Sequence, residues 1–451
     1  MRLTTYYFMD YNVLFVLCDT LRRDIINLYG GPVRMQNLSN LARDGVVYND
    51  AISPSPWTIP AHVSFFSGMY LNEHGIHETQ KLRTWHVTNN NKSIKDRLIS
   101  GILSRRGYNT LGISTNLLVS TITGLDAGFN TFFNLDTVPT RYQLRQDKDL
   151  IKMVRSGYSN SEIAVSLLKK MKINTLFKYG LAYLKTRSTE KALNFPFDKG
   201  ASAVNMILSS SNWNEPFFRF INLMEVHEPY RHSSYRGPQE NFKSERNKRR
   251  EMSRVKTEYM KEAEYLDLML GKILLTLKKQ GVYDDTMVIV TSDHGQAFNE
   301  HGYIDHGVYL YDELVRVPMV IKYPKNRKFE RKKGYQSLVN LPKVIVSATE
   351  GGDDSDLTTE SAFSESYGLN VPISGRDLKN NRPLVNLYER PRKTVFEGGF
   401  KLTVEGKTGR IEEFMKDGKD VSNDIKYSKV RKELIDKIDI FKGQEKFLLP
   451  E

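Results

Sequence analysis

Five short apolar runs constrain the fold of this chain more strongly than any other feature. They are Asn12–Cys18 (NVLFVLC), Asn109–Ser114 (NTLGIS), Phe217–Leu223 (FFRFINL), Thr286–Ser292 (TMVIVTS) and Val317–Tyr323 (VPMVIKY). Runs of this kind are typical of strands that are buried on both faces, as in parallel sheets. Helical patterns lie between them, and the clearest, Glu258–Gln280, ends at Gly281. Alternation of strands and helices predicts an α/β fold whose sheet carries helices on both faces.

The chain is long enough for a large domain and a smaller one, with 451 residues of which 39% are hydrophobic. We expect the large domain over residues 1–380. Within it, residues 134–214 are rich in lysine and tyrosine and read as a helical insertion, and residues 241–256 form a basic run that we interpret as a solvated helix or loop. Over residues 381–451 the pattern changes to short strand pairs and a lysine-rich helix, which predicts a small α+β subdomain.

The charge and the cysteine content bear on partners and compartment. The formal charge of +13 favours an anionic partner such as a charged ester. We expect no nucleic-acid partner, because the chain has neither zinc-finger spacing nor a basic region followed by heptads. The single cysteine, Cys18, allows no intramolecular disulfide and fits a reducing compartment. We find no pattern of a signal peptide or an integral membrane segment, so we expect a cytoplasmic protein. The oligomeric state is left open.

Polar side chains follow several of the predicted strands directly. Asp19, Asn116, His227 and the pair Asp293-His294 all lie at or just beyond a strand end. In open α/β sheets, ligands bind at the carboxyl ends of the strands. Two carboxylates and an imidazole (Asp19, Asp293 and His294) form a plausible ligand set for a divalent metal ion. The alternatives are that Asp19 caps a helix and that His294 is a packed core histidine.

The stretch SPSPWTIPAH holds Thr58 between prolines, just before an apolar run. A threonine at a helix start is either the N-cap or a nucleophile. Both readings share one geometry, because the free N–H groups of a helix N-terminus attract an anionic ester. A metal ion beside the hydroxyl would activate it for attack on phosphorus or sulfur. His62 lies one helical turn further on and is expected on the same side.

A loop that follows the second acidic motif carries His301 and His306. Loops often hold functional residues, and His306 is placed to protonate a leaving oxygen. The alternative is a structural histidine that only makes hydrogen bonds.

In this order, the motifs resemble the sulfatase branch of the alkaline phosphatase superfamily. The segments that carry the resemblance are NVLFVLCDTLRRD, WTIPAHVSFFSGMYLNEHG, NLMEVHEPY, GVYDDTMVIVTSDHGQAFNEHG with HGVYLYDELVRVPMVI, and FEGGFKLTVEGKTGRIEEFMKDGKDVSND. The resemblance implies a mixed, mostly parallel sheet flanked by helices on both faces, with a small C-terminal α+β subdomain. Residues 134–214 resemble nothing in the family.

The resemblance also implies roles for the residues at the strand ends. Asp19, Asp293 and His294 would hold one divalent metal ion, namely Ca²⁺, Mn²⁺ or Mg²⁺. Thr58 would be the nucleophile and would also touch the metal ion. His62 occupies the place of an arginine that usually supports the nucleophile.

Three further positions are implied to contact the substrate. His227 would contact the transferred group. His306 lies where the family often has a lysine that helps the leaving group. Asn116 lies near the place of another such lysine.

Two departures from the family pattern shape the predicted chemistry. Thr58 stands where active sulfatases have the cysteine or serine that becomes formylglycine, so no formylglycine is expected. The family's paired aspartates appear as Asp19-Thr20, so one carboxylate ligand is missing. Threonine nucleophiles are typical of relatives that act on phosphorus.

We therefore predict a metal-dependent hydrolase that cleaves a phosphate or sulfate ester through a covalent Thr58 intermediate. Its substrate would be an anionic ester, such as a glycan or a lipid headgroup. The alternatives are a transferase that passes the phospho group to a glycan or lipid acceptor, and a degenerate member that binds anionic glycans without catalysis.

Overall fold

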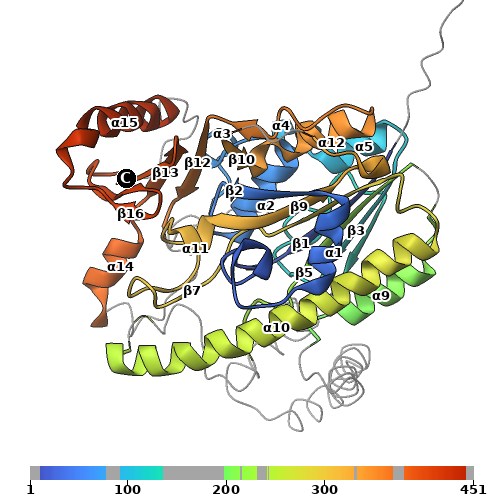
Figure 1. Cartoon of the computed structure of the whole chain (residues 1–451), viewed down its shortest axis with the longest axis horizontal. Helices are drawn as coiled ribbons and strands as arrows, with labels where there is room; N and C mark the ends of the chain where they lie inside the picture. Colours follow the sequence, from blue (N-terminus) through green and yellow to red (C-terminus); the bar gives the residue numbers. More distant parts are fainter. Residues whose placement is uncertain are drawn as a thin grey trace, which may run out of the picture.

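The computed structural model of the chain is built around a sheet of nine strands in the order β11-β10-β2-β9-β6-β1-β5-β3-β4 (Figure 1). The structure describes residues 11–77, 92–135, 198–213, 216–230, 241, 243–329, 333–368 and 380–442. The strands are β1 (Asn12–Cys18), β2 (Val46–Ile52), β3 (Asn109–Ser114), β4 (Thr131–Asn134), β5 (Phe217–Leu223), β6 (Thr286–Thr291), β9 (Arg316–Lys322), β10 (Tyr335–Ser337) and β11 (Thr358–Thr359).

The sheet is mixed and mostly parallel, which confirms the predicted fold class. β1 lies in its middle and runs parallel to both β5 and β6. β9 is antiparallel to its neighbours β6 and β2, and β11 is antiparallel to β10. Because β1, β5, β6 and β3 point the same way, their carboxyl ends meet at one edge.

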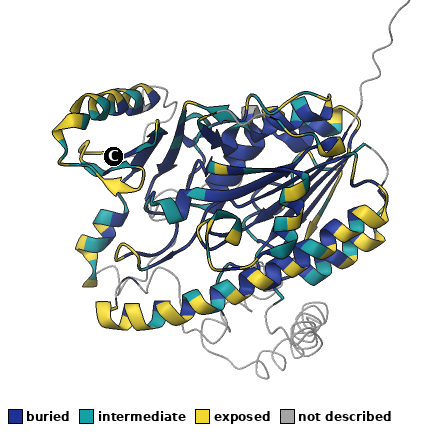
Figure 2. Cartoon of the chain, viewed as in Figure 1, coloured by how far each residue is buried: buried dark blue, intermediate teal, exposed yellow. Residues whose placement is uncertain are grey.

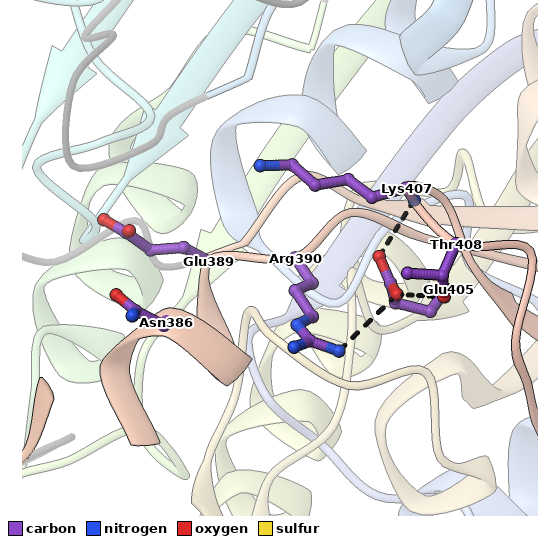
Figure 3. Close-up of a pocket in the computed structure, with 6 residues that line it drawn as sticks. All are labelled: Asn386, Glu389, Arg390, Glu405, Lys407 and Thr408. Carbon is purple, nitrogen blue, oxygen red and sulfur yellow. Dashed lines mark hydrogen bonds and ion pairs between the residues drawn. The ribbon is translucent and has the colours of Figure 1, made fainter. Parts of the chain in front are cut away.

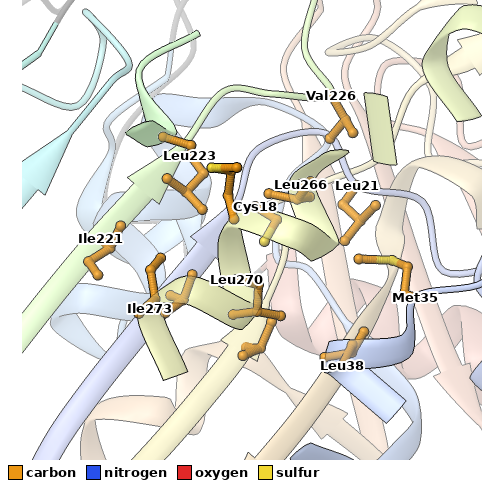
Figure 4. Close-up of a cluster of buried hydrophobic side chains, with 14 of the residues drawn as sticks. Cys18, Leu21, Met35, Leu38, Ile221, Leu223, Val226, Leu266, Leu270 and Ile273 are labelled. Carbon is orange, nitrogen blue, oxygen red and sulfur yellow. The ribbon is translucent and has the colours of Figure 1, made fainter. Parts of the chain in front are cut away.

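Helices cover both faces of this sheet, so its apolar strands are buried on both sides (Figure 2). Leu14, Val16 and Cys18 of β1 belong to a core cluster with α1 (Gln36–Asp44), α9 (Ala201–Ser210) and α10 (Glu245–Lys279). Figure 4 shows Leu266, Leu270 and Ile273 of α10 packed beside Cys18 and Ile221. The alternate residues Val13, Phe15 and Leu17 join a second cluster with α2 (Thr58–Ser67), α5 (Ile99–Arg105) and α12 (Leu341–Thr349). The unbroken apolar sequence of β1 is thus explained by two cores rather than one.

The long helix α10 extends beyond the predicted segment Glu258–Gln280. It begins at Glu245, so most of the basic run at 241–256 is its first part. In this part Met252 and Val255 are buried, whereas Arg246 and Arg249 are exposed. Apolar residues are sparse there, which is why the helical period was weak in the sequence.

The C-terminal part forms a second, antiparallel sheet of five strands. Its strands are β12 (Ser361–Ser366), β13 (Arg392–Glu397), β14 (Phe400–Glu405), β15 (Ile411–Lys416) and β16 (Lys419–Asp420). Helix α15 (Ser428–Lys442) packs Leu434 and Ile438 against Leu402 and Phe414 of this sheet. β12 lies upstream of residue 381, the predicted boundary, so the sheet takes one strand from the segment assigned to the large domain.

The predicted insertion at residues 134–214 falls largely outside the described residues. What the structure describes of it includes the end of β4 and helix α9. Among the described residues, no helix is both long enough and apolar enough to cross a membrane.

The packing of aromatic rings around Phe220 of β5 gives a prediction about stability. Phe220 is fully buried, and its ring centroid lies 4.8 Å from that of Phe66 and 5.5 Å from that of Phe15. We expect Phe220→Ala to lower the free energy of unfolding by about 3–5 kcal/mol, since it leaves a cavity in a packed core. Phe133 on β4 is 41% exposed, so Phe133→Ala should cost less than about 1 kcal/mol. Denaturant unfolding of both variants measures the difference, and equal losses would contradict the packing.

Candidate active site

The carboxyl ends of β1 and β6 bring two acidic residues together. Ligand atoms of Asp19, Asp293 and His294 all lie within 4.8 Å of one another, and all three residues are fully buried. Asn116, which follows β3, donates from Nδ2 to Oδ2 of Asp19 at 2.6 Å. The sequence predicts that these four residues lie at one edge of the sheet, and the structure has them there. Asn116 contacts a carboxylate of the cluster, a position from which it orients Asp19.

Two oxygen atoms of this cluster lack a hydrogen-bond partner among the described residues. Oδ1 of Asp19 and Oδ2 of Asp293 are buried and accept no hydrogen bond from the described residues. Burial raises the pKa of Asp293 to about 7. Burial together with the Asp293 charge raises the pKa of Asp19 to about 6. Buried carboxylates that lack a partner are costly unless a cation neutralises them. The unpaired oxygens therefore fit a divalent metal ion between them.

His294 presents one nitrogen to the same place. Its Nδ1 lies 2.9 Å from the carbonyl oxygen of Gly295, and because a carbonyl only accepts, the proton is on Nδ1. Nε2 is then left with a lone pair, and it lies 3.4 Å from Oδ2 of Asp293. Burial lowers the pKa of His294 to about 3, so the ring is neutral near pH 7, as a metal ligand must be. Fixing one ring nitrogen on a carbonyl is the usual support for a histidine ligand.

Thr58 is the first residue of α2, and Trp57 takes the N-cap position. The Thr58 hydroxyl lies 3.2 Å from Nε2 of His294, so it faces the cluster of possible metal ligands. The first N–H groups of a helix have no partner within the helix, which leaves those of Thr58 and Ile59 available to an anion. Of the two readings of Thr58, the geometry favours the reactive hydroxyl over the N-cap.

Thr20 does not replace the missing second aspartate of the family pattern. Its backbone has φ 60°, a left-handed conformation that is rare for a β-branched residue. Its hydroxyl donates to the carbonyl of Val226 at 2.9 Å, and its N–H donates to Oδ1 of Asp293 at 3.3 Å. Thr20 thus helps to hold the Asp293 carboxylate in place. Its hydroxyl is directed at the loop that follows β5.

His62 contacts the backbone of Thr58 rather than its hydroxyl. Its Nδ1 donates to the carbonyl oxygen of Thr58 at 2.8 Å, and its Nε2 accepts from Asn222 at 3.2 Å. Nδ1 lies 3.8 Å from Oδ2 of Asp293. Burial lowers the pKa of His62 to about 3, so this ring is neutral and stands behind the reactive groups. An arginine-like role toward the nucleophile would require a charge that this ring does not carry.

His306 and His227 form a group of rings next to His294. The ring centroid of His306 is 4.5 Å from that of His294 and 5.4 Å from that of His227. Trp57 stacks on His306 at 5.1 Å. His301, the other histidine of the loop, is 47% exposed and faces Glu313, so it is not part of this group.

The two histidines differ in charge. Burial lowers the pKa of His306 to about 3. Burial also opposes the charged form of His227, but the negative charges of Glu228 and Asp19 outweigh it and raise the pKa of His227. His227 therefore holds a proton more readily than His306 does.

Three residues that support the site were not predicted from the sequence. Trp57 stacks on His306, Gln296 accepts from Nδ1 of His306 at 2.6 Å, and Glu228 lies beside His227. All three lie within the quoted motifs, one or two residues from a predicted site residue, and this closeness is the signal that could have found them.

A separate hollow of about 320 Å³ lies in the C-terminal part (Figure 3). It is lined by Asn386, Glu389, Arg390, Glu405, Lys407 and Thr408. The Glu405 carboxylate in it accepts from the hydroxyl of Thr408 at 2.5 Å and from the backbone N–H of Lys407 at 2.8 Å. It contains none of the predicted site residues.

Comparison with known proteins identifies the family of the chain. A profile of the sulfatase family matches residues 11–351. The chain belongs to the sulfatase family. It is thus a hydrolase of the class that acts on sulfuric or phosphoric ester bonds.

Individual relatives are distant but span most of the chain. The uncharacterized sulfatase YidJ of Escherichia coli is 23% identical over 360 residues, which cover 75% of this chain and 67% of the relative. Phosphonate monoester hydrolase of Agrobacterium radiobacter has the same fold, with a TM-score of 0.61, 17% identity and 96% of each chain covered. A further solved structure, in complex with its substrate D-glucosamine-2-N,6-O-disulfate, gives a TM-score of 0.58 at 14% identity, with 97% of this chain and 98% of that chain covered.

The buried carboxylates predict how metal binding and pH are linked. Because folding raises the pKa values of Asp19 and Asp293, the metal-free protein loses stability as the pH rises from about 4 to about 7. A divalent cation removes this cost. We expect Mn²⁺ or Ca²⁺ to raise the Tm of metal-stripped protein by at least about 3 °C more at pH about 7.5 than at pH about 5.

Thermal unfolding with and without chelator measures this difference, and Asp293→Asn should reduce it. An equal rise in Tm at both pH values would show that the two carboxylates do not hold the cation.

Proposed function

We propose that this protein hydrolyses a phosphate or sulfate ester through a covalent intermediate on Thr58, with one divalent cation at Asp19, Asp293 and His294. One observation carries the proposal: the Thr58 hydroxyl lies 3.2 Å from His294 Nε2 at the start of a helix, beside two buried carboxylate oxygens that accept no hydrogen bond from the described residues. These oxygen-rich donors suit Ca²⁺, Mn²⁺ or Mg²⁺.

A divalent cation at this cluster would lower the pKa of the Thr58 hydroxyl and neutralise charge on the ester oxygens. The N-terminal N–H groups of α2 would bind and orient the anionic group. Thr58 then attacks in line, and the ester oxygen leaves. Asn116 and Thr20 keep Asp19 and Asp293 in place through their hydrogen bonds.

His227 is the proton donor that we propose for the leaving oxygen. His306 is a poor donor, because the ring is neutral and its Nδ1 proton is directed to Gln296. The raised pKa of His227 keeps a proton on that ring. Water then releases the anion from Thr58, and His227 recovers its proton in this second step.

We propose phosphorus as the preferred centre and a charged glycan or lipid headgroup as the substrate class. Thr58 has no route to formylglycine, the group on which sulfatase chemistry depends in the family. The formal charge of +13 supports an anionic substrate. Relatives of this fold include both a phosphonate monoester hydrolase and a protein whose substrate is a disulfated sugar.

One observation favours a rival function, a member that binds anionic glycans without catalysis. Thr20 turns its hydroxyl to Val226, so the cluster lacks one carboxylate ligand of the family pattern. Turnover separates the two functions, because a binding protein has no reaction to lose.

Substitution of the nucleophile gives the direct kinetic test. With Mn²⁺ or Ca²⁺, we expect release of nitrophenol from a nitrophenyl phosphate monoester or diester, and loss of this activity with chelator. Thr58→Ala should lower kcat/KM by at least about 1,000-fold, because no hydroxyl remains to attack. Thr58→Ser keeps the hydroxyl and should retain turnover within about 100-fold of the wild type.

Ser67→Ala is the matched control on the same helix. Its hydroxyl only donates to the carbonyl of Val63 at the far end of α2, so kcat should not change. Metal-dependent turnover that persists in Thr58→Ala would contradict the proposed nucleophile. A faster reaction with nitrophenyl sulfate would contradict the preference for phosphorus.

A further inference from the structure

The turn that follows β1 holds Asp19 and is strained at the next residue. The N–H of Leu21 donates to the carbonyl oxygen of Cys18 at 3.2 Å, which closes a turn of four residues. Thr20, the third of the four, has a φ of 60°, and no other residue of the turn has a positive φ. This is the pattern of a type II turn, whose third residue is usually glycine or asparagine. A β-branched residue keeps such a conformation only where the surrounding structure maintains it.

Tyr259 of α10 contacts the backbone on both sides of the strained residue. Its side chain is fully buried, and its hydroxyl donates to the carbonyl oxygen of Thr20 at 2.8 Å. The same hydroxyl accepts the N–H of Arg22 at 2.7 Å. The ring itself is held by Phe298, whose ring centroid is 4.9 Å away. A single hydroxyl thus spends its donor and an acceptor position on this turn.

We propose that Tyr259 is a positioning residue for the cation at Asp19 and Asp293. Its hydroxyl keeps Thr20 in the left-handed conformation, and Thr20 in turn orients the Asp293 carboxylate. Tyr259 touches neither the cation nor the ester. The inference rests on the proposed function, because the cation that it concerns is the one proposed there.

The link from Thr20 to Asp293 is a backbone hydrogen bond. Oδ1 of Asp293 accepts the N–H of Thr20 at 3.3 Å and the N–H of His294 at 2.9 Å. Oδ2 accepts no hydrogen bond from the described residues, so it is the oxygen that remains for a cation. The two N–H groups therefore decide which carboxylate oxygen faces the metal position.

Relaxation of Thr20 would reverse this link. A type I turn has the same ends as a type II turn, but the peptide between its second and third residues is turned over, and the third residue has a negative φ. In this chain that peptide joins Asp19 to Thr20. Its reversal would withdraw the Thr20 N–H from Asp293 and direct the carbonyl oxygen of Asp19 at the carboxylate instead. Two oxygens that face each other repel, so the Asp293 carboxylate would rotate and present a different oxygen.

Removal of one oxygen atom tests the proposal. Tyr259→Phe keeps the buried ring and deletes only the hydroxyl. In full-length protein stripped with chelator, we expect its Kd for Mn²⁺, measured by calorimetry, to rise by about 10–100-fold, the usual effect of losing a group that orients a metal ligand. Because the loss is one of cation affinity, saturating Mn²⁺ should restore most of the turnover of Tyr259→Phe but none of that of Thr58→Ala.

Tyr283→Phe is the matched control. Its ring is also buried, and its hydroxyl donates to Oδ2 of Asp44 at 2.8 Å. Tyr283 precedes β6 and so lies at the amino end of that strand, whereas Asp293 follows the carboxyl end. This variant should bind Mn²⁺ as the wild type does, and thermal unfolding without metal shows that both phenylalanine variants are folded.

Glycine at position 20 separates a positioning role from a purely structural one. Glycine adopts a positive φ without strain, so it keeps the turn without help from Tyr259. Thr20→Gly alone should leave the Kd for Mn²⁺ within about threefold of the wild type. Added to Tyr259→Phe, it should recover at least about 10-fold of the lost affinity. A hydroxyl that only stabilised the fold would not be replaced by a glycine.

The outcomes distinguish this inference from the proposed function. Unchanged Mn²⁺ affinity in Tyr259→Phe, or no recovery in the double variant, would overturn the positioning role and leave the Thr58 mechanism intact. Wild-type protein that binds Mn²⁺ without any turnover would contradict the proposed function, while the affinities of the variants would still decide the role of Tyr259. Wild-type protein that binds no divalent cation would overturn both.

Discussion

Burial of two like-charged carboxylates at the end of the central strands is the constraint on which the rest of this structure depends. Asp19 and Asp293 follow the neighbouring parallel strands β1 and β6. Their side chains are therefore buried close together. Each has an oxygen without a hydrogen-bond partner among the described residues, although Asn116 and Thr20 bind the others. Such a pair is costly while both members are ionised, and either a proton or a cation removes that cost, so near neutral pH the fold favours a bound cation.

The remaining parts of the site lie around the two carboxylates. Helix α2 begins with the hydroxyl of Thr58 next to His294, and the N–H groups of its first turn are at the same end of the helix. His62 ties the first turn of this helix to β5 through Asn222, which connects the position of the nucleophile to the core. The nucleophile is thus fixed by a helix and a strand rather than by a loop alone. Such rigidity preserves the close approach that an in-line attack requires.

Much of this arrangement could be predicted from the sequence, because the strands concerned are apolar throughout. β1, β3 and β5 have the predicted bounds, and the polar residues that follow them converge as strand direction requires. β2 (VVYNDAI) was missed, since polar residues interrupt its apolar pattern. β12 (SAFSES) was missed because serine and glutamate residues interrupt its apolar pattern.

The candidate site likewise contains residues that the sequence predicted and contacts that it did not. Asp19, Asp293, His294 and Thr58 were predicted because each stands at the end of a strand or the start of a helix. The contacts of His62 could not be predicted, because helical spacing fixes its direction but not its partners. The closeness of Glu228 to His306 depends on two loops that meet only in three dimensions.

The most direct test of this account is to trap the covalent intermediate. Protein that is turning over a nitrophenyl phosphate ester in the presence of Mn²⁺ is quenched with acid, digested and analysed by mass spectrometry. The account predicts one added phosphoryl group on Thr58, and on the serine in Thr58→Ser. A phosphoryl group on another residue, or inversion of configuration at a chiral phosphorus during turnover, would contradict it.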